Sequence, residues 1–155
     1  MNGKVEARLA SLGIALPAAP NPVANYVPSV IAGNLLFISG QISKAADGSI
    51  AQGRLGAELN IAQGSAAARL CALNLLAQAK AAVGELDRIA HVVKLTGFVN
   101  ASPDFTDHPQ VMNGASDLMV EVFGDKGRHA RAAVGVSGLP MGCAVEVDAI
   151  MLIGN

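Results

Sequence analysis

Aromatic and charged side chains are scarce in this sequence. Aromatic residues make up 3% of the chain, with no Trp, and charged residues 15%, whereas hydrophobic residues reach 52%. This composition excludes a disordered chain, because burial of the apolar surface offsets the conformational entropy lost on folding. The core must therefore be built mainly from Ala, Val, Leu and Ile.

Long apolar runs and runs of like charge are also missing. No stretch approaches the roughly 20 uninterrupted apolar residues of a membrane span, and residues 1–16 lack the apolar region of a secretory signal. The eleven Lys and Arg residues are scattered and the net charge is −1, so no basic surface for nucleic acid is visible. We expect a cytoplasmic protein that binds neither membranes nor nucleic acids.

Sequence motifs for cofactors and metals are absent as well. There is no G-x-G-x-x-G after a strand, no P-loop and no zinc-type spacing. The two cysteines, Cys71 and Cys143, lie far apart and are predicted to be reduced thiols rather than a disulfide. The histidines are predicted to fall in a strand, at a helix start and in a loop, with surface or packing roles: His91, His108 and His129.

What the chain does contain is apolar surface in excess. A length of 155 residues fits one domain with a substantial core. The mean hydropathy of +0.42 is high for a soluble protein. We interpret the excess as surface that is buried between subunits.

Turn residues and β-rich runs predict the strands of an α+β fold. Two runs flank Gly33-Asn34, a two-residue hairpin turn, and a second turn at Asp47-Gly48 extends them into a β-meander. A further strand is predicted over residues 89–101, and the last two strands follow within 128–151.

Helical spacing of apolar residues predicts three helices, over residues 3–12, 61–83 and 108–122. The two long helices would cover one face of the sheet. The other face also carries apolar residues, and we expect another subunit to cover it. The proline-rich residues 17–26 are predicted to form an extended arm.

Two charged residues stand out in the last predicted strands. Arg131 lies at a strand mouth, where its planar guanidinium suits either a bound carboxylate or a structural ion pair. Glu146 lies between Val145 and Val147, and a period of two places it on the opposite face. Its carboxylate either faces solvent or lines a cleft between subunits and activates water. Periodicity alone leaves both alternatives open.

Three segments resemble the YjgF/RidA superfamily of reactive-intermediate deaminases. They are "YVPSVIAGNLLFISGQI", with S-G-Q at its end, "VVKLTGFVNASPDF", and "ARAAVGVSGLPMGCAVEVDAI". The third is similar to the family's A-R-x-x-V-x-V-x-x-L-P-x-x-x-x-[VI]-E-[VI]-x-A-I signature and is the most specific. The likeness covers residues 22–153. Residues 1–21, a helix and an arm before the domain of residues 22–155, are typical of a longer RidA-like subgroup.

The resemblance implies a fold and an activity. The fold would be chorismate-mutase-like, with a six-stranded mixed sheet, two helices on one face and a short N-terminal helix. Three copies would enclose a barrel and form inter-subunit clefts. Such proteins hydrolyse 2-imino or enamine acids to 2-keto acids and ammonia, without a metal or an organic cofactor.

The resemblance also implies residue roles. Arg131 matches the arginine that grips the substrate carboxylate, and Glu146 matches the glutamate that holds the attacking water. Residues that match the cleft lining are Tyr26, reaching across the subunit interface, Ser39 and Gly40.

Some positions depart from the family pattern. Asn113 lies where the family often has a cleft asparagine, but next to a length difference. The cysteine that commonly follows the arginine by two positions is Ala133 here, and Gly135 and Gly138 replace bulkier residues. These changes indicate a roomier site or another ligand. A non-catalytic binder of keto acids or metabolites on the same trimer is therefore an alternative, and RNA cleavage or translation inhibition is a remote one, given the near-neutral charge.

Overall fold

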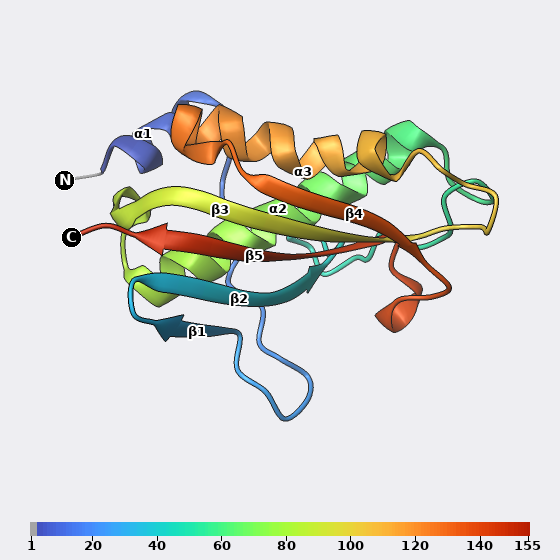
Figure 1. Ribbon diagram of the computed structural model, residues 1–155, viewed down its shortest axis with the longest axis horizontal. Helices are drawn as coiled ribbons and strands as arrows, with labels where there is room; N and C mark the ends of the chain where they lie inside the picture. The colour runs from blue at the N-terminus through green and yellow to red at the C-terminus, as the bar shows by residue number, and fades with distance from the viewer. Residues whose placement is uncertain (1–2) are drawn as a thin grey trace.

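The protein, described by a computed structural model over residues 3–155, has an α+β architecture (Figure 1). Its elements, in chain order, are α1 (Lys4–Ser11), β1 (Ser29–Ala32), β2 (Leu35–Ile42), α2 (Ile61–Val83), β3 (Ile89–Asn100), α3 (His108–Phe123), β4 (Ala130–Val136) and β5 (Val145–Ile153). Short 3-10 turns precede β3, follow α3 and precede β5. The predicted helices and the Gly33-Asn34 hairpin are confirmed to within a residue.

The sheet has five strands in the order β1-β2-β5-β3-β4, so the predicted sixth strand is wrong. The chain does turn at Asp47-Gly48, as predicted, but it returns with only one isolated bridge, between Lys44 and Ile50. The β-meander therefore stops after β2. A single bridge cannot satisfy the row of backbone groups that defines a strand.

The last two strands are not neighbours in the sheet. β3 lies between them, parallel to β4 and antiparallel to β5. Residues 137–144, between β4 and β5, therefore cross over β3 and do not join two neighbouring strands. This order puts β4 at an open edge of the sheet, beside α3 (Figure 1).

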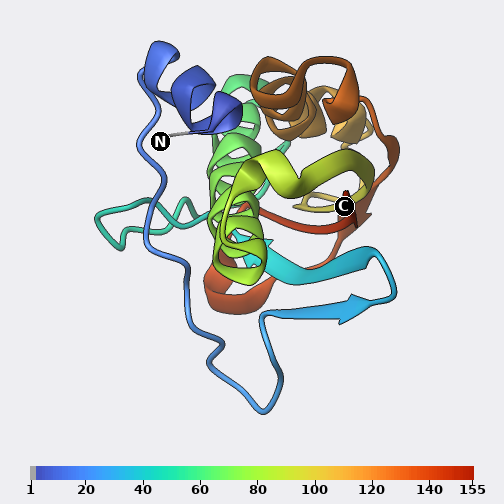
Figure 2. The same ribbon diagram turned by 90° about the vertical axis from the view of Figure 1, so that its left-hand side faces the viewer.

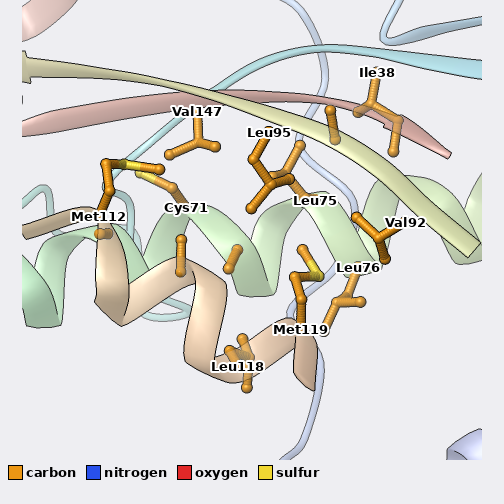
Figure 3. Packing of buried hydrophobic residues seen from close by; sticks show 14 of the residues in the cluster. Ile38, Cys71, Leu75, Leu76, Val92, Leu95, Met112, Leu118, Met119 and Val147 are labelled. Carbon is orange, nitrogen blue, oxygen red and sulfur yellow. The ribbon is translucent and has the colours of Figure 1, made fainter. Parts of the chain in front are cut away.

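Both long helices lie on one face of the sheet, as predicted (Figure 2). α2 begins with a capping box, in which Asn60 accepts from the Gln63 amide and the Gln63 side chain accepts from the Asn60 amide. Its alanine-rich face packs on β2 and β5, and α3 packs on α2 and β3. Figure 3 shows Leu75, Leu95, Met119 and Val147 meeting in this core.

The opposite sheet face is not covered within one chain. Phe37 and Val134, near the two edges of that face, are 41% and 44% exposed. Ile150 lies on the same face, because it is the cross-strand partner of Phe37. The second face therefore carries apolar residues, as predicted from the sequence, and what covers it stays a prediction.

The N-terminal helix and the beginning of the arm lie against the rest of the chain, and residues 23–27 then form an exposed loop (Figure 2). Leu9 of α1 is 4% exposed and belongs to the main core. In the arm, the carbonyl of Pro20 accepts a 2.6 Å hydrogen bond from the Gln78 side chain. No helix within residues 3–155 is long and apolar enough to cross a membrane.

Candidate functional site

Glu146 lies on the uncovered face of the sheet, as its periodicity predicted. Its strand neighbours Val145 and Val147 are fully buried on the helix side, whereas Glu146 is half-buried. Burial, and to a smaller extent the carboxylate of Asp148, raises the pKa of Glu146 above its usual range. A carboxyl group with a raised pKa is a better proton acceptor at its site than an ordinary surface carboxylate.

Gly40 on β2 lies directly beside this carboxylate. A Cβ atom at position 40 would stand 2.6 Å from Glu146 Oε2 and 2.9 Å from its Cδ. Only glycine therefore leaves room for the carboxylate to rest against the β2 backbone. The structure thus brings two of the predicted site residues together.

A cavity of about 440 Å³ opens in front of Glu146. Tyr26, which is half-exposed, and Gly40 line it, and Lys44 brings a positive charge to its wall. Met141 also lines the cavity and has a left-handed backbone with φ 57°, which is unusual for a side chain of this kind. Segments far apart in the sequence (arm, hairpin and β4–β5 crossover) meet here.

Ser39, predicted to line the cleft, does not line this cavity within one chain. Its hydroxyl donates to the carbonyl of Val27 at 2.8 Å. The backbone amide of Ser39 likewise donates to Pro28, at 2.9 Å. Ser39 therefore holds the segment that carries Tyr26 against β2.

Arg131 lies elsewhere, in a cluster of polar groups at the edge between β4 and α3. Its Nη1 donates to Asn113 Oδ1 at 2.9 Å and to Ser116 Oγ at 3.1 Å. Its Nη2 donates to the carbonyl of Pro109 at 3.4 Å. The predicted residue Asn113 thus contacts Arg131, and no carboxylate of residues 3–155 forms an ion pair with it.

Arg131 and Glu146 point to opposite faces of the sheet in one chain. Arg131 is paired across the strands with Leu95, which is fully buried under the helices. Glu146 is paired with Phe98, three positions further along β3. An odd separation along a strand reverses the face, so one chain cannot bring the two groups to the same ligand.

Ala133 and Gly135 continue the row of Arg131 along β4. Ala133 packs against the core. A Cβ atom at position 135 would stand 2.4 Å from His108 Nε2, and the imidazole of His108 meets Phe105 edge-on with ring centroids 5.3 Å apart. His108 therefore occupies the space that a side chain at position 135 would fill. Gly138 has no atoms near its Cβ direction.

Sequence reasoning missed three polar residues of these two regions: Lys44, Ser116 and His129. Ser116 and His129 contact each other at 2.8 Å beside Arg131. The sequence carries a weak signal for Ser116, which lies one helical turn after Asn113 and so on the same face of α3. Nothing in the sequence places His129 beside it. Both cysteines are free and buried, and no group of three metal-binding side chains occurs among residues 3–155.

Residues 6–150 match a protein family described as "YjgF/chorismate mutase-like, putative endoribonuclease". Protein TCP17 of Trypanosoma cruzi is 54% identical over 155 residues, which cover 99% of this chain and 97% of that protein. A 2-iminobutanoate/2-iminopropanoate deaminase of Dermatophagoides farinae is 29% identical over 141 residues, which cover 90% of this chain and 94% of that protein.

Solved structures share the fold. A crystal structure from Shewanella oneidensis, described as a "putative endoribonuclease", has a TM-score of 0.93 and 37% identity, and covers 97% of this chain and 100% of that chain. TdcF of E. coli, crystallised with bound serine, has a TM-score of 0.64 and 26% identity, and covers 86% of this chain and 92% of that chain.

Proposed function

The chain belongs to the YjgF/chorismate-mutase-like family, and on that premise we propose that it hydrolyses 2-imino acids to 2-keto acids and ammonia. The reaction would take place in clefts between three copies of the chain. The observation that carries this proposal is the hydrogen bonding of Arg131, which leaves two N–H donors of its guanidinium without an acceptor among residues 3–155.

A guanidinium has five N–H donors. Two acceptors, Asn113 and Ser116, match the two hydrogens of Arg131 Nη1, and Pro109 takes one hydrogen of Nη2. The donors without an acceptor among residues 3–155 are the Nε–H and one hydrogen of Nη2. Nε and Nη2 share one edge of the guanidinium, and we infer that the free Nη2 hydrogen lies on this edge, where it would bind a carboxylate bidentately together with Nε–H.

Glu146 would supply the proton acceptor for the attacking water. The water oxygen forms a bond to C2 of the iminium group, the C=N π electrons move to nitrogen, and Glu146 takes a proton from the water. The proton then passes to the amine nitrogen, the C–N bond breaks and ammonia leaves. Loss of the hydroxyl proton gives the keto acid. Since an iminium carbon is already electrophilic, orientation and charge neutralisation supply most of the catalysis.

A second copy of the chain would bring the two halves together. Arg131 lies on the α3 side of the β4 edge, whereas Tyr26, Gly40 and Glu146 line a cavity beside β2, which Asn74 and Gln78 of α2 also line. A cleft formed by the β4 edge of one subunit and the cavity of its neighbour contains both groups. The uncovered apolar sheet face then faces the inside of a trimer.

The relatives support the same chemistry. The Dermatophagoides farinae protein is named for the hydrolysis of small 2-imino acids. TdcF holds serine, a small amino acid with the same carboxylate next to a nitrogen-bearing carbon. Both cover nearly all of this chain's single domain, so the likeness includes both halves of the proposed site.

Binding without turnover is a second candidate function, and Ala133 is the observation that favours it. The family commonly has a thiol at this position, two residues beyond the arginine. The keto acid would then bind at Arg131 while imine hydrolysis is not accelerated. Some relatives are described as endoribonucleases. RNA binding relies on an excess of positive charge, whereas the net charge of this chain is −1.

The proposal is tested by releasing 2-iminobutanoate in situ with a dehydratase and timing the appearance of 2-oxobutanoate. The protein is expected to accelerate hydrolysis, and Arg131→Ala to lower kcat/KM about 100-fold, since a charged bidentate contact is lost. Arg128→Ala is the matched control, because Arg128 is an exposed arginine three positions away whose side chain pairs with Asp125. Equal rates with and without protein would overturn the enzymatic proposal. Equal rates of the two variants would overturn the role of Arg131.

A further inference from the structure

We propose that Ser116 and His129 are positioning residues for Arg131: they hold its guanidinium in the orientation that receives the substrate carboxylate. This inference rests on the proposed function and adds two residues to its binding site. They come from different segments, Ser116 from the middle of α3 and His129 from the loop before β4.

The hydrogen bonds define a chain of contacts with one consistent direction. His129 Nδ1 lies 2.6 Å from the carbonyl oxygen of Gly127, which can only accept, so Nδ1 carries a hydrogen. In the neutral ring, Nε2 is then the acceptor, and at 2.8 Å it receives the hydroxyl hydrogen of Ser116. The lone pairs of Ser116 Oγ are left to face Arg131 Nη1 at 3.1 Å.

Burial favours the neutral ring that this direction requires. It lowers the pKa of His129 below its ordinary value, and the charges of Arg131 and His91 act in the same sense, against the hydrogen bond to Gly127. His129 is half-buried beside a permanent positive charge. A neutral imidazole therefore accepts from Ser116 without adding a second cation next to the guanidinium.

Gly127, whose carbonyl fixes the His129 ring, is itself held closely against α3. Gly127 is buried, and a Cβ atom at position 127 would stand 2.1 Å from the carbonyl oxygen of Met119 in α3. The backbone that holds His129 thus lies directly on the helix that carries Ser116. A free arginine side chain has many rotamers, and this arrangement removes that freedom before the ligand arrives.

Fixing the guanidinium plane of Arg131 should affect binding of the ligand's carboxylate and not of its apolar part. Three contacts from α3 hold the guanidinium plane: Asn113 and Ser116 at Nη1, and the carbonyl of Pro109 at Nη2. Removing one of them lets the plane turn and weakens bidentate contact with a carboxylate. It leaves apolar contacts of the ligand unchanged.

Two pairs of variants test the inference by calorimetric titration with 2-oxobutanoate. Ser116→Ala and His129→Asn break the chain, since Asn can still reach Gly127 but not Ser116. Ser116→Thr and His129→Gln keep a hydroxyl and an acceptor, respectively. The first pair is expected to weaken binding about five- to tenfold, and the second pair to stay within about twofold of the wild type. All four variants should bind the neutral analogue 2-oxobutanamide with the affinity of the wild type.

The outcomes separate this inference from the proposed function. If Arg131→Ala binds 2-oxobutanoate as tightly as the wild type, the carboxylate site and the inference are both wrong. If Arg131→Ala weakens binding while Ser116→Ala and His129→Asn do not, only the inference is wrong. The inference is also wrong if Ser116→Ala and His129→Asn weaken binding of the neutral amide as much as binding of 2-oxobutanoate. A general structural defect would affect both ligands in this way. In an Arg131→Ala background, Ser116→Ala should not weaken binding of 2-oxobutanoate any further. If Ser116→Ala does not fold, the two His129 variants decide alone.

Discussion

At the scale of single residues, the geometry around Glu146 makes Gly40 a position where one methyl group matters. The Cβ of Gly40→Ala would push the Glu146 carboxylate away from β2, because the distance to Oε2 would be only 2.6 Å. The Glu146 side chain is flexible, so the fold should survive while the attacking water is misplaced. We expect imine hydrolysis to fall about ten- to a hundredfold, with the melting temperature nearly unchanged.

Gly138→Ala is the control for this variant, because nothing lies near its Cβ direction. It should retain wild-type activity in the same dehydratase-coupled assay. A Gly40→Ala protein as active as Gly138→Ala would show that Glu146 does not hold the water.

The raised pKa of Glu146 has a consequence for the pH dependence of stability. The folded state holds the proton more tightly than the unfolded state, whose value is near 4.5. The stabilisation by this group is therefore present at low pH and is lost as pH rises through the folded-state pKa. Glu146→Gln, which cannot ionise, should be more stable than the wild type at pH 7, by less than about 1 kcal/mol because solvent screens half of the group.

Urea unfolding of the two proteins at pH 4 and pH 7 checks this expectation. The advantage of Glu146→Gln should be smallest at pH 4 and grow toward pH 7. An advantage that is constant with pH would mean that the carboxylate is not destabilised by burial. The same variant should lose imine hydrolysis, so stability and activity would change in opposite directions.

At the scale of elements, the packing of α2 against α3 fixes the position of α3, which carries the hydrogen-bond partners of Arg131. A Cβ atom at Gly114 would stand 2.0 Å from the carbonyl oxygen of Ser65 in α2, which is backbone and cannot move aside. Alanine favours a helix by roughly 1 kcal/mol over glycine, yet we expect Gly114→Ala to destabilise the protein by about 1–3 kcal/mol through overpacking.

Chemical unfolding measures this change, and binding of 2-oxobutanoate reports its effect on the site. Asn113 and Ser116 lie within two positions of Gly114, so a shift of α3 should also weaken the contacts to Arg131. The same substitution at Gly138 should leave both measurements unchanged. A stabilised Gly114→Ala protein would show that α2 and α3 leave room for a methyl group at Gly114.

At the scale of the whole molecule, the uncovered sheet face predicts self-association. Phe37 and Val134 are large apolar side chains that are 41% and 44% exposed on one chain. In the proposed trimer both would be buried, and the mass would be about 47 kDa, three times 15.7 kDa. Phe37→Glu would bury a charge in that interface, so we expect it to dissociate the trimer and abolish imine hydrolysis.

Light scattering after size exclusion tests this expectation. Ala62→Glu, on the exposed side of α2, is the control and should remain trimeric. A wild-type mass near that of one chain would overturn the shared cleft. Retained activity in a monomeric Phe37→Glu protein would contradict it in the same way.

Periodicity and turn chemistry predicted much of the architecture, because these signals are local. The bounds of α2 and the Gly33-Asn34 turn depend on neighbours within a few positions. The alternation around Glu146 correctly separated its face from that of Val145 and Val147. The missing sixth strand was not predictable in this way, because pairing after Asp47-Gly48 depends on a distant partner.

The sequence by itself determined the fold class, the family and the candidate residues Arg131 and Glu146. Only the tertiary structure decided that these two groups lie on opposite faces of one chain, since the insertion of β3 between β4 and β5 sets their register. It also placed His129 and Ser116 beside Arg131. A hydrogen bond between side chains depends on distances of a few tenths of an ångström across the fold, and no spacing along the chain encodes them.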